Sequence, residues 1–322
     1  MIELNKVTKR YGDHTVVDEV TFSVAKGEIV GFLGPNGAGK STTMNILTGY
    51  ISSNSGTAKI DGIDILEDPI AVKRKIGFLP EQPPLYLDMK VIEYLNFIYD
   101  LKGCTLNRKK HIEEVLGVVS IDKEHQNRLI KNLSKGYRQR VGIAQALVGN
   151  PEVLIFDVPT VGLDPKQIID IRNLIKKLGR NHTVILSTHI LPEVQAVCDR
   201  IIIINKGKIV ANERTERIAE LAGGPGSLVA KICGPQNEVV RAVRSLPGVV
   251  SADLMPQSEV DCITLAVTAE PNVDIRKPLF NLLAKNSWPL IGLNAMGVSL
   301  EDIFIRLTSG KAEKRKPKGE NN

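Results

Sequence analysis

The chain has 322 residues, of which 43% are hydrophobic and 24% are charged, and its net charge is +6. These values are ordinary for a globular protein with a sizeable core, and no apolar run approaches the roughly 18 residues needed to span a bilayer. The first residues also lack the apolar segment of a signal peptide, so a cytoplasmic location is expected. Half of the net charge lies in the tail 310–322, so the rest of the chain carries only the other half. This is too little for a nucleic-acid-binding surface, and no nucleic-acid partner is expected.

The first third of the chain predicts β-strands and a phosphate-binding loop. Residues 2–8 alternate apolar and polar, as an edge strand does, and residues 20–24 are also β-like. The apolar run 28–33 predicts a buried strand, and residues 43–48 predict a helix.

Between that strand and that helix, residues 34–42 match the spacing G-x-x-x-x-G-K-[ST]. Glycines allow backbone N–H groups to turn inward, and the start of a helix favours an anion. Lys40 is expected at the β- and γ-phosphates of a nucleotide, and Ser41 is expected to hold Mg²⁺. The predicted nucleotide-binding residues of this loop are Gly34, Asn36, Gly37, Ala38, Gly39, Lys40, Ser41 and Thr42.

The middle of the chain predicts a helical subdomain inside an α/β core. Residues 76–80 predict a short strand that ends before two prolines, and helical periodicity runs from 91 to about 127. The helical subdomain is expected over about 84–150. Strands at 153–157 and 183–187, joined by a helix at 165–178, predict a βαβ unit in a parallel sheet. The carboxyl ends of its strands would place Asp157 and His189 beside the phosphate loop.

A second domain is predicted beyond a hairpin at 201–210 and a glycine-rich linker at 223–226. Its expected order is β, α, β, β, α, β, which matches a ferredoxin-like fold over 226–309 and includes a closing amphipathic helix at 299–307. We expect this second domain to have a regulatory or dimerisation role. The basic tail 310–322 is expected to be disordered, as a solubilising end or, alternatively, as a contact for anionic lipid headgroups. The predicted elements are β at 227–233, α at 236–245, β at 249–255, β at 261–268, α at 273–285 and β at 289–295.

The four cysteines, Cys104, Cys198, Cys233 and Cys262, are far apart in the sequence and lack metal-ligand spacing. They are expected to be reduced, buried and structural.

In their order, these motifs resemble the nucleotide-binding subunit of an ABC (ATP-binding cassette) transporter over residues 1–222. The resemblance implies a P-loop NTPase core, a parallel sheet with an antiparallel β margin, and ATP with Mg²⁺ as ligands. It places Tyr11 against adenine, Gln82 and Asp157 at Mg²⁺, and His189 at the γ-phosphate.

The resemblance also implies partners. Ser134 and Gly136 of the signature motif would face the γ-phosphate held by a second, identical subunit, and Asp164 lies in the loop that crosses this dimer. An integral membrane permease would dock on residues 91–127 and the Gln82 region, which places the protein at the inner face of the cell membrane. Lys135, Tyr137 and the C-terminal extension resemble the ABC-2 type exporter branch.

One position departs from the family. Val158 stands where the family has the glutamate that acts as general base, and valine cannot accept a proton. Loss of such a base typically costs about 10²–10⁴-fold in rate. We therefore predict ATP binding with slow hydrolysis. His189 or Asp164 as a substitute base, and a point variant of an active enzyme, remain open. A nucleotide-gated regulator and a non-transport ABC ATPase remain alternative functions.

Overall fold

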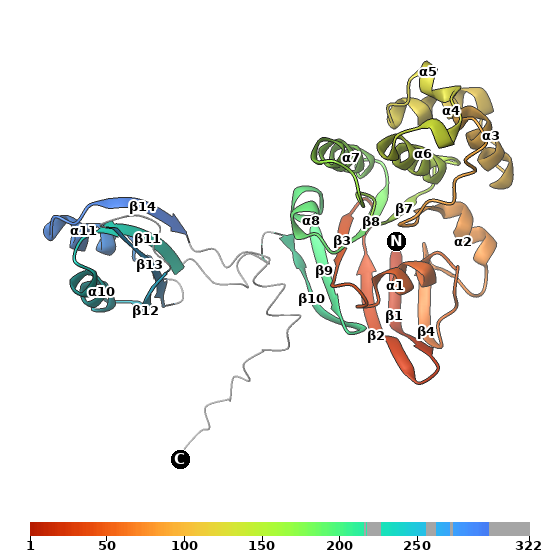
Figure 1. Cartoon of the computed structure of the whole chain (residues 1–322). Helices are drawn as coiled ribbons and strands as arrows, with labels where there is room; N and C mark the ends of the chain where they lie inside the picture. The colour runs from red at the N-terminus through yellow and green to blue at the C-terminus, as the bar shows by residue number, and fades with distance from the viewer. Residues whose placement is uncertain (216, 218–226, 256–261, 271–272, 296–322) are drawn as a thin grey trace, which may run out of the picture. The chain divides into compact units, whose positions relative to one another are not determined.

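The computed structural model describes residues 1–215, 217, 227–255, 262–270 and 273–295 (Figure 1). The chain divides into two compact units, Met1–Thr215 and Glu216–Asn322. The predicted boundary at 222, the linker 223–226, the amphipathic helix 299–307 and the tail 310–322 lie outside the described residues.

The first unit is built around a six-stranded sheet with the order β10-β9-β3-β8-β7-β6. The five strands from β9 to β6 are parallel, and β10 pairs antiparallel with β9. Every residue of β3, β7 and β8 is buried, which explains their continuous apolar runs. The strands are β3 (Ile29–Leu33), β6 (Ile76–Leu79), β7 (Val153–Asp157), β8 (Thr183–Thr188), β9 (Arg200–Asn205) and β10 (Lys208–Arg214).

A second, antiparallel sheet of this unit has the order β2-β1-β4-β5. Residues 2–8 were predicted as an edge strand, and this is wrong because β1 pairs with both β2 and β4. Their alternation arises because one face of β1 packs in the core while the other is exposed. The strands are β1 (Ile2–Tyr11), β2 (His14–Val24), β4 (Ser55–Ile60) and β5 (Ile63–Asp64).

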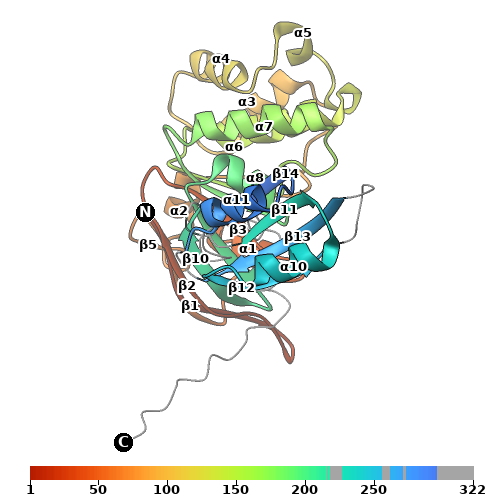
Figure 2. The same ribbon diagram turned by 90° about the vertical axis from the view of Figure 1, so that its left-hand side faces the viewer.

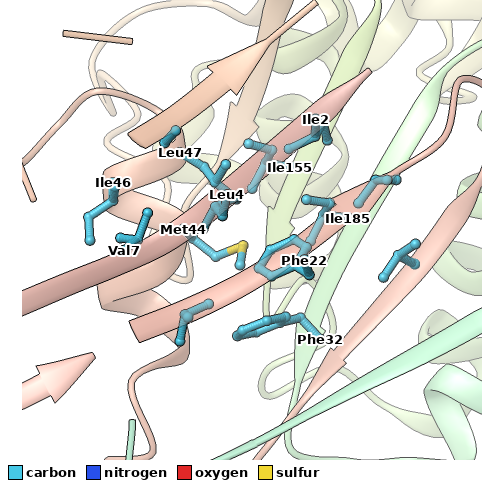
Figure 3. Packing of buried hydrophobic residues seen from close by; sticks show 14 of the residues in the cluster. Ile2, Leu4, Val7, Phe22, Phe32, Met44, Ile46, Leu47, Ile155 and Ile185 are labelled. Carbon is cyan, nitrogen blue, oxygen red and sulfur yellow. The ribbon is translucent and has the colours of Figure 1, made fainter. Parts of the chain in front are cut away.

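Helix α1 (Lys40–Leu47) joins the two sheets through one hydrophobic core. Met44 and Leu47 of α1 lie beside Leu4 of β1 and Phe22 of β2 (Figure 3). The rings of Phe22 and Phe32 are 5.6 Å apart, so β2 and β3 also meet in this core. The start of α1 is therefore held at the carboxyl end of β3, an interior strand of the six-stranded sheet.

Short helices lie between β5 and β9, and several begin at a side-chain cap. Asp68, Asn107, Asp122, Ser134 and Asp164 each accept a hydrogen bond from the backbone of the helix that they precede. The elements are α2 (Pro69–Lys75), α3 (Val91–Leu101), α4 (Arg108–Val118), α5 (Lys123–Gln126), η1 (Ile130–Asn132), α6 (Lys135–Leu147), α7 (Pro165–Leu178) and α8 (Leu191–Val197).

The second unit has the predicted ferredoxin-like fold (Figure 2). Its antiparallel sheet has the order β12-β13-β11-β14, and both helices pack on one face of it in a single core. The elements are β11 (Ser227–Cys233), α10 (Gln236–Arg244), β12 (Val249–Leu254), β13 (Cys262–Ala269), α11 (Arg276–Lys285) and β14 (Leu290–Ala295).

Cys233 and Cys262 are joined by a disulfide across β11 and β13, where they are direct partners in the strand register. The prediction of four reduced cysteines is therefore wrong for this pair. A sequence separation of 29 residues gave no sign that strand pairing would make them neighbours. Cys104 is a half-buried free thiol and Cys198 a buried one.

Across the described ranges, His, Cys, Asp and Glu form no group of three or more that could hold a metal ion. Within the same ranges, no helix has the length and apolar character needed to cross a membrane.

Candidate nucleotide-binding site

The phosphate loop connects the carboxyl end of β3 to the start of α1. Gly37 and Gly39 have φ angles of 78° and 104°, which favour glycine. A Cβ on Gly39 would lie 2.7 Å from the Val16 carbonyl oxygen, and one on Gly34 would lie 2.5 Å from the Ile204 carbonyl oxygen. No side chain caps the N-terminus of α1. The loop thus leaves backbone N–H groups available to an anion.

Lys40 lies across this loop and is 6% exposed. Its ammonium donates hydrogen bonds to the carbonyl oxygens of Gly34 at 2.8 Å and Pro35 at 3.0 Å. Burial lowers the pKa of Lys40, while the negative charges of Asp157 and Glu81 act to raise it. A phosphate at the loop would offer this ammonium a charged acceptor in place of two neutral ones.

A pocket of about 510 Å³ opens over the loop. One wall comes from the loop and α1, and a second wall comes from the segments that follow β7 and β8. The lining residues are Asn36, Gly37, Gly39, Lys40, Ser41 and Thr42 on the first wall and Val158, Val161 and His189 on the second, and Val16 and Glu81 complete the lining. The fold therefore brings His189 to the phosphate loop, as the sheet topology predicted.

Of the residues predicted to hold the nucleotide and Mg²⁺, five do not line this pocket, and one of them is Asp157, which is buried at the end of β7. Gly34 and Ala38 belong to the loop but not to its lining, and Tyr11, 52% exposed, ends β1. Gln82 is exposed and also outside the lining, whereas its neighbour Glu81 is part of it. Sequence reasoning overlooked Glu81. The usable signal was its place two residues beyond the end of β6, on the edge where parallel sheets bind ligands.

Asp157 ends β7 and is 4% exposed. Its Oδ1 atom is buried and has no hydrogen-bond partner within the described part of the chain. An unpaired carboxylate oxygen is unfavourable in a protein interior unless something else satisfies it. Carboxylate and hydroxyl oxygens are ligands that Mg²⁺ prefers, so Asp157 together with Ser41 fits such an ion.

Val158 has a backbone conformation that a valine rarely adopts. Its φ angle is 44°, in the left-handed region, and its side chain is 6% exposed. Its N–H donates to the Ser187 carbonyl at 2.8 Å, which holds the residue at the pocket wall. The wall presents methyl groups at the position where the family resemblance expects a carboxylate.

Glu193 connects the segments after β7 and β8 and is 1% exposed. One of its carboxylate oxygens accepts a hydrogen bond from the Thr160 hydroxyl, and the other accepts one from the Thr188 hydroxyl at 2.8 Å. The Thr188 hydroxyl in turn accepts from the Ile190 N–H at 3.0 Å. Both neighbours of His189 are therefore fixed, and the two segments form one wall.

The predicted signature residues form a second pocket of about 310 Å³. Ser134 caps α6, Asp164 caps α7, and a Cβ on Gly136 would lie 2.6 Å from the Gln167 side chain. The pocket is lined by Ser120, Ser134, Gly136, Tyr137, Arg140, Asp164, Lys166, Gln167, Asp170 and Ile171. It shares no lining residue with the phosphate-loop pocket. One chain therefore carries two separate halves of the predicted site.

Comparison with known proteins shows the family to which the chain belongs. Residues 17–161 match the family model described as ABC transporter. The chain is 32% identical to the linearmycin resistance ATP-binding protein LnrL of Bacillus subtilis, over 96% of this chain and 98% of that protein. It is 39% identical to the bacitracin transport ATP-binding protein BcrA of Bacillus licheniformis, over 65% of this chain and 68% of that protein.

Among solved structures, a dimeric bacterial ABC transporter cassette is similar with a TM-score of 0.62 and 31% identity, over 67% of this chain and 99% of that one. The chain belongs to the family of ABC transporter ATP-binding proteins. Its first unit is accordingly a nucleotide-binding P-loop NTPase, and the family activity is that of an ATPase.

Proposed function

We propose that the chain is the motor subunit of an exporter, which binds ATP with Mg²⁺, pairs with a second copy and drives a separate membrane permease. Relatives named for bacitracin transport and linearmycin resistance support an export role. The dimeric cassette of similar fold supports the pairing. On this proposal the protein is peripheral at the inner face of the cell membrane.

The observation that carries the proposal is the separation of the two pockets. The phosphate loop, with Lys40 and Ser41, and the signature residues, with Ser134 and Gly136, line different pockets of one chain. A head-to-tail pair would bring the phosphate loop of one copy against the signature residues of the other. The start of α6, capped by Ser134, would then face the γ-phosphate with its partial positive charge.

Within each half, the residues have distinct roles. The loop amides and the Lys40 ammonium would hold the phosphates, Tyr11 would stack on adenine, and His189 would contact the γ-phosphate. Ser41 and Asp157 would hold Mg²⁺, for which Gln82 was also predicted. Mg²⁺ neutralises charge on the β- and γ-phosphates when it is bound.

We further propose that Val158 slows hydrolysis more than it weakens binding. Its side chain lines the pocket without a group that can accept a proton. The loop amides and Lys40, which would hold the phosphates, belong to the other wall. Losing a positioned base typically lowers the rate about 10²–10⁴-fold.

An exposed apolar surface near the helical subdomain is the proposed permease contact. Tyr86, Leu87, Phe97 and Leu101 are 54%, 45%, 36% and 70% exposed. The Tyr86 ring packs on Tyr94 and on Phe97, with centroids 6.0 and 5.4 Å apart, which gives the surface a fixed shape. Aromatic and aliphatic residues of this kind suit a protein interface.

Binding and pairing test the proposal together. The full chain is titrated with Mg²⁺–ATP by calorimetry, and its size is measured with ATP and with ADP. We expect heat of binding and a dimer that is enriched with ATP. A folded chain that gives no heat with Mg²⁺–ATP would refute nucleotide binding. Co-purification with an integral membrane protein would support the transport role.

A second candidate is a nucleotide-gated regulator that binds ATP without efficient turnover, and the apolar wall at Val158 favours it. Phosphate release during co-reconstitution with a permease separates the two. Turnover that rises with the permease favours the motor, whereas tight binding without turnover favours the regulator.

A further inference from the structure

Four buried side-chain atoms have no hydrogen-bond partner within the described residues, and two of them belong to neighbouring strands. Gln139 Nε2 and Arg172 Nε lie in α6 and α7. Asp157 Oδ1 lies in β7 and Ser187 Oγ lies in β8, on residues that are 4% and 0% exposed. An enclosed polar atom without a partner is unfavourable, so two of them on paired strands indicate an interaction that would satisfy both.

The strand register places these two side chains side by side. Asp157 and Ser187 are direct partners in the parallel pairing of β7 and β8. Such partners point to the same face of a sheet, and adjacent strands are about 4.8 Å apart. Ile155 and Ile185, two residues earlier, are also partners, and both belong to the hydrophobic core that includes Met44 of α1 (Figure 3). Because side chains alternate along a strand, Asp157 and Ser187 also face α1.

Helix α1 runs back over this face from the phosphate loop, because the loop leaves the carboxyl end of β3. The helix begins at Lys40, four residues before Met44. A helix rises about 1.5 Å and a strand about 3.3 Å per residue, so four residues back along α1 and two residues forward along the strands both cover about 6 Å. The negative charge of Asp157 acts on the Lys40 ammonium, which agrees with this placement. Asp157 and Ser187 therefore face the start of α1, where Lys40 and Ser41 line the pocket.

The two carboxylate oxygens of Asp157 are not equivalent. Only Oδ1 is enclosed without a partner, so Oδ2 is the oxygen that an ion could reach. The Ser187 hydroxyl is carried by one rotatable carbon–carbon bond, and it can turn towards Oδ1 and donate a hydrogen bond to it. Carboxylates that bind a metal ion are generally hydrogen-bonded by a second group, and loss of that group typically lowers metal affinity about 10–100-fold.

We propose that Ser187 is a positioning residue for the Mg²⁺ that accompanies ATP, an inference that rests on the proposed function. Its hydroxyl donates a hydrogen bond to Oδ1 of Asp157 and holds the carboxylate so that Oδ2 faces the ion. Ser187 itself touches neither the ion nor the nucleotide. Its loss should therefore weaken the contribution of Mg²⁺ to ATP binding and leave the binding of the phosphates by the loop unchanged.

The test compares Ser187→Ala with Thr183→Val, which removes a buried hydroxyl from the other end of the same strand. The Thr183 hydroxyl accepts a hydrogen bond from the Gly27 N–H at 3.0 Å. Calorimetry measures the ATP affinity of the full chain with EDTA and with Mg²⁺, and the ratio of the two affinities is the gain due to the ion. We expect this gain to fall about 10-fold in Ser187→Ala, with no change in the affinity measured in EDTA. Thr183→Val should keep the full gain.

The urea midpoint of the chain without ATP or Mg²⁺ distinguishes this role from a purely structural one. Thr183→Val should lower the midpoint because a hydrogen bond is lost, whereas Ser187→Ala should not, because it removes a hydroxyl without a partner.

Three results would overturn the assignment. They are a full Mg²⁺ gain in Ser187→Ala, an equal loss of its ATP affinity with EDTA and with Mg²⁺, and a wild-type chain whose ATP affinity does not respond to Mg²⁺. In each of them the wild-type chain still binds ATP, so they differ from failure of the proposed function, in which it gives no heat with Mg²⁺–ATP.

Discussion

The two walls of the nucleotide pocket differ in how closely their residues match the pattern that the family resemblance predicts. On the phosphate-loop wall, the glycines have the required φ angles and the lysine and hydroxyl residues are in place. On the other wall, a valine with a left-handed backbone occupies the position where the family resemblance predicts the general base. Binding groups and proton-accepting groups therefore come from different segments of the sheet edge. We therefore expect the rate of hydrolysis to change with substitutions on the second wall while the affinity for ATP is kept.

Val158→Glu gives the largest expected effect, because it restores a carboxylate to the second wall only. We expect phosphate release to rise about 10²-fold or more, with ATP affinity changed only a few-fold. Glutamate is not β-branched, so it also fits the left-handed backbone better than valine. Steady-state phosphate release on the full chain measures the change.

Val158→Gln is the matched control, since it has the shape of glutamate without its basicity. It should bind ATP and remain slow. If Gln accelerated turnover as much as Glu does, relief of backbone strain would explain the gain and the proton-acceptor role would be refuted.

Lys40→Met alters the first wall only. We expect about 10²-fold weaker ATP binding, because a charge-assisted contact worth roughly 2–3 kcal/mol is lost. The fold should persist, since methionine fills the buried site without a charge that needs satisfying. Titration with a fluorescent ATP analogue measures the affinity, and Lys26→Met, at a side chain 80% exposed, is the control. Equal affinities in both variants would contradict the role of Lys40.

Glu193→Gln tests the attachment within the second wall. An amide retains one acceptor oxygen, but its NH₂ group faces a threonine hydroxyl, so one of the two hydrogen bonds is weakened or reorganised. We expect a loss of about 1–2 kcal/mol in the free energy of unfolding of the first unit, measured by urea titration. The double variant with Thr160→Val should lose less than the two single changes summed, because both act on one hydrogen bond. Full additivity would show that the bond contributes nothing.

Sequence reasoning predicted the motifs on both walls better than it predicted the contacts between them. The phosphate loop was predictable because glycine, lysine and hydroxyl spacing fixes its backbone and chemistry locally. The ferredoxin-like order of the second unit followed from periodicity. By contrast, β1 was placed at an edge because alternation reports burial of one face and not the number of neighbouring strands. The Cys233–Cys262 pair depends on strand register, and the place of Glu81 in the pocket depends on how β6 and the phosphate loop come together; both are properties of the tertiary structure.

The smallest expected effect concerns Glu28, which precedes β3, and Arg200, which begins β9. Both lie at the amino ends of these strands, whereas the phosphate loop follows the carboxyl end of β3. The Arg200 guanidinium donates to both carboxylate oxygens of Glu28, at 2.6 and 2.9 Å, and also to the Ser23 carbonyl at 2.6 Å. Burial acts to raise the pKa of Glu28, but the hydrogen bonds from Arg200 and from the Ala25 N–H, together with the charge of Arg200, leave it below its usual value. Because this pKa is lower in the folded state, the stabilisation is present above the unfolded pKa and is lost as pH falls through the folded one.

Glu28→Gln should therefore lower the free energy of unfolding of the first unit by about 1 kcal/mol at pH 7, and the difference from wild type should shrink below about pH 4.5. Urea titrations at both pH values measure this, and ATP affinity and turnover at pH 7 should be unchanged. A gap of the same size at both pH values would show that ionised Glu28 contributes nothing there. If Glu28→Gln changed turnover without changing stability, a residue at the amino ends of the strands would act on the chemistry in the pocket. The comparison of the two walls assumes that it does not.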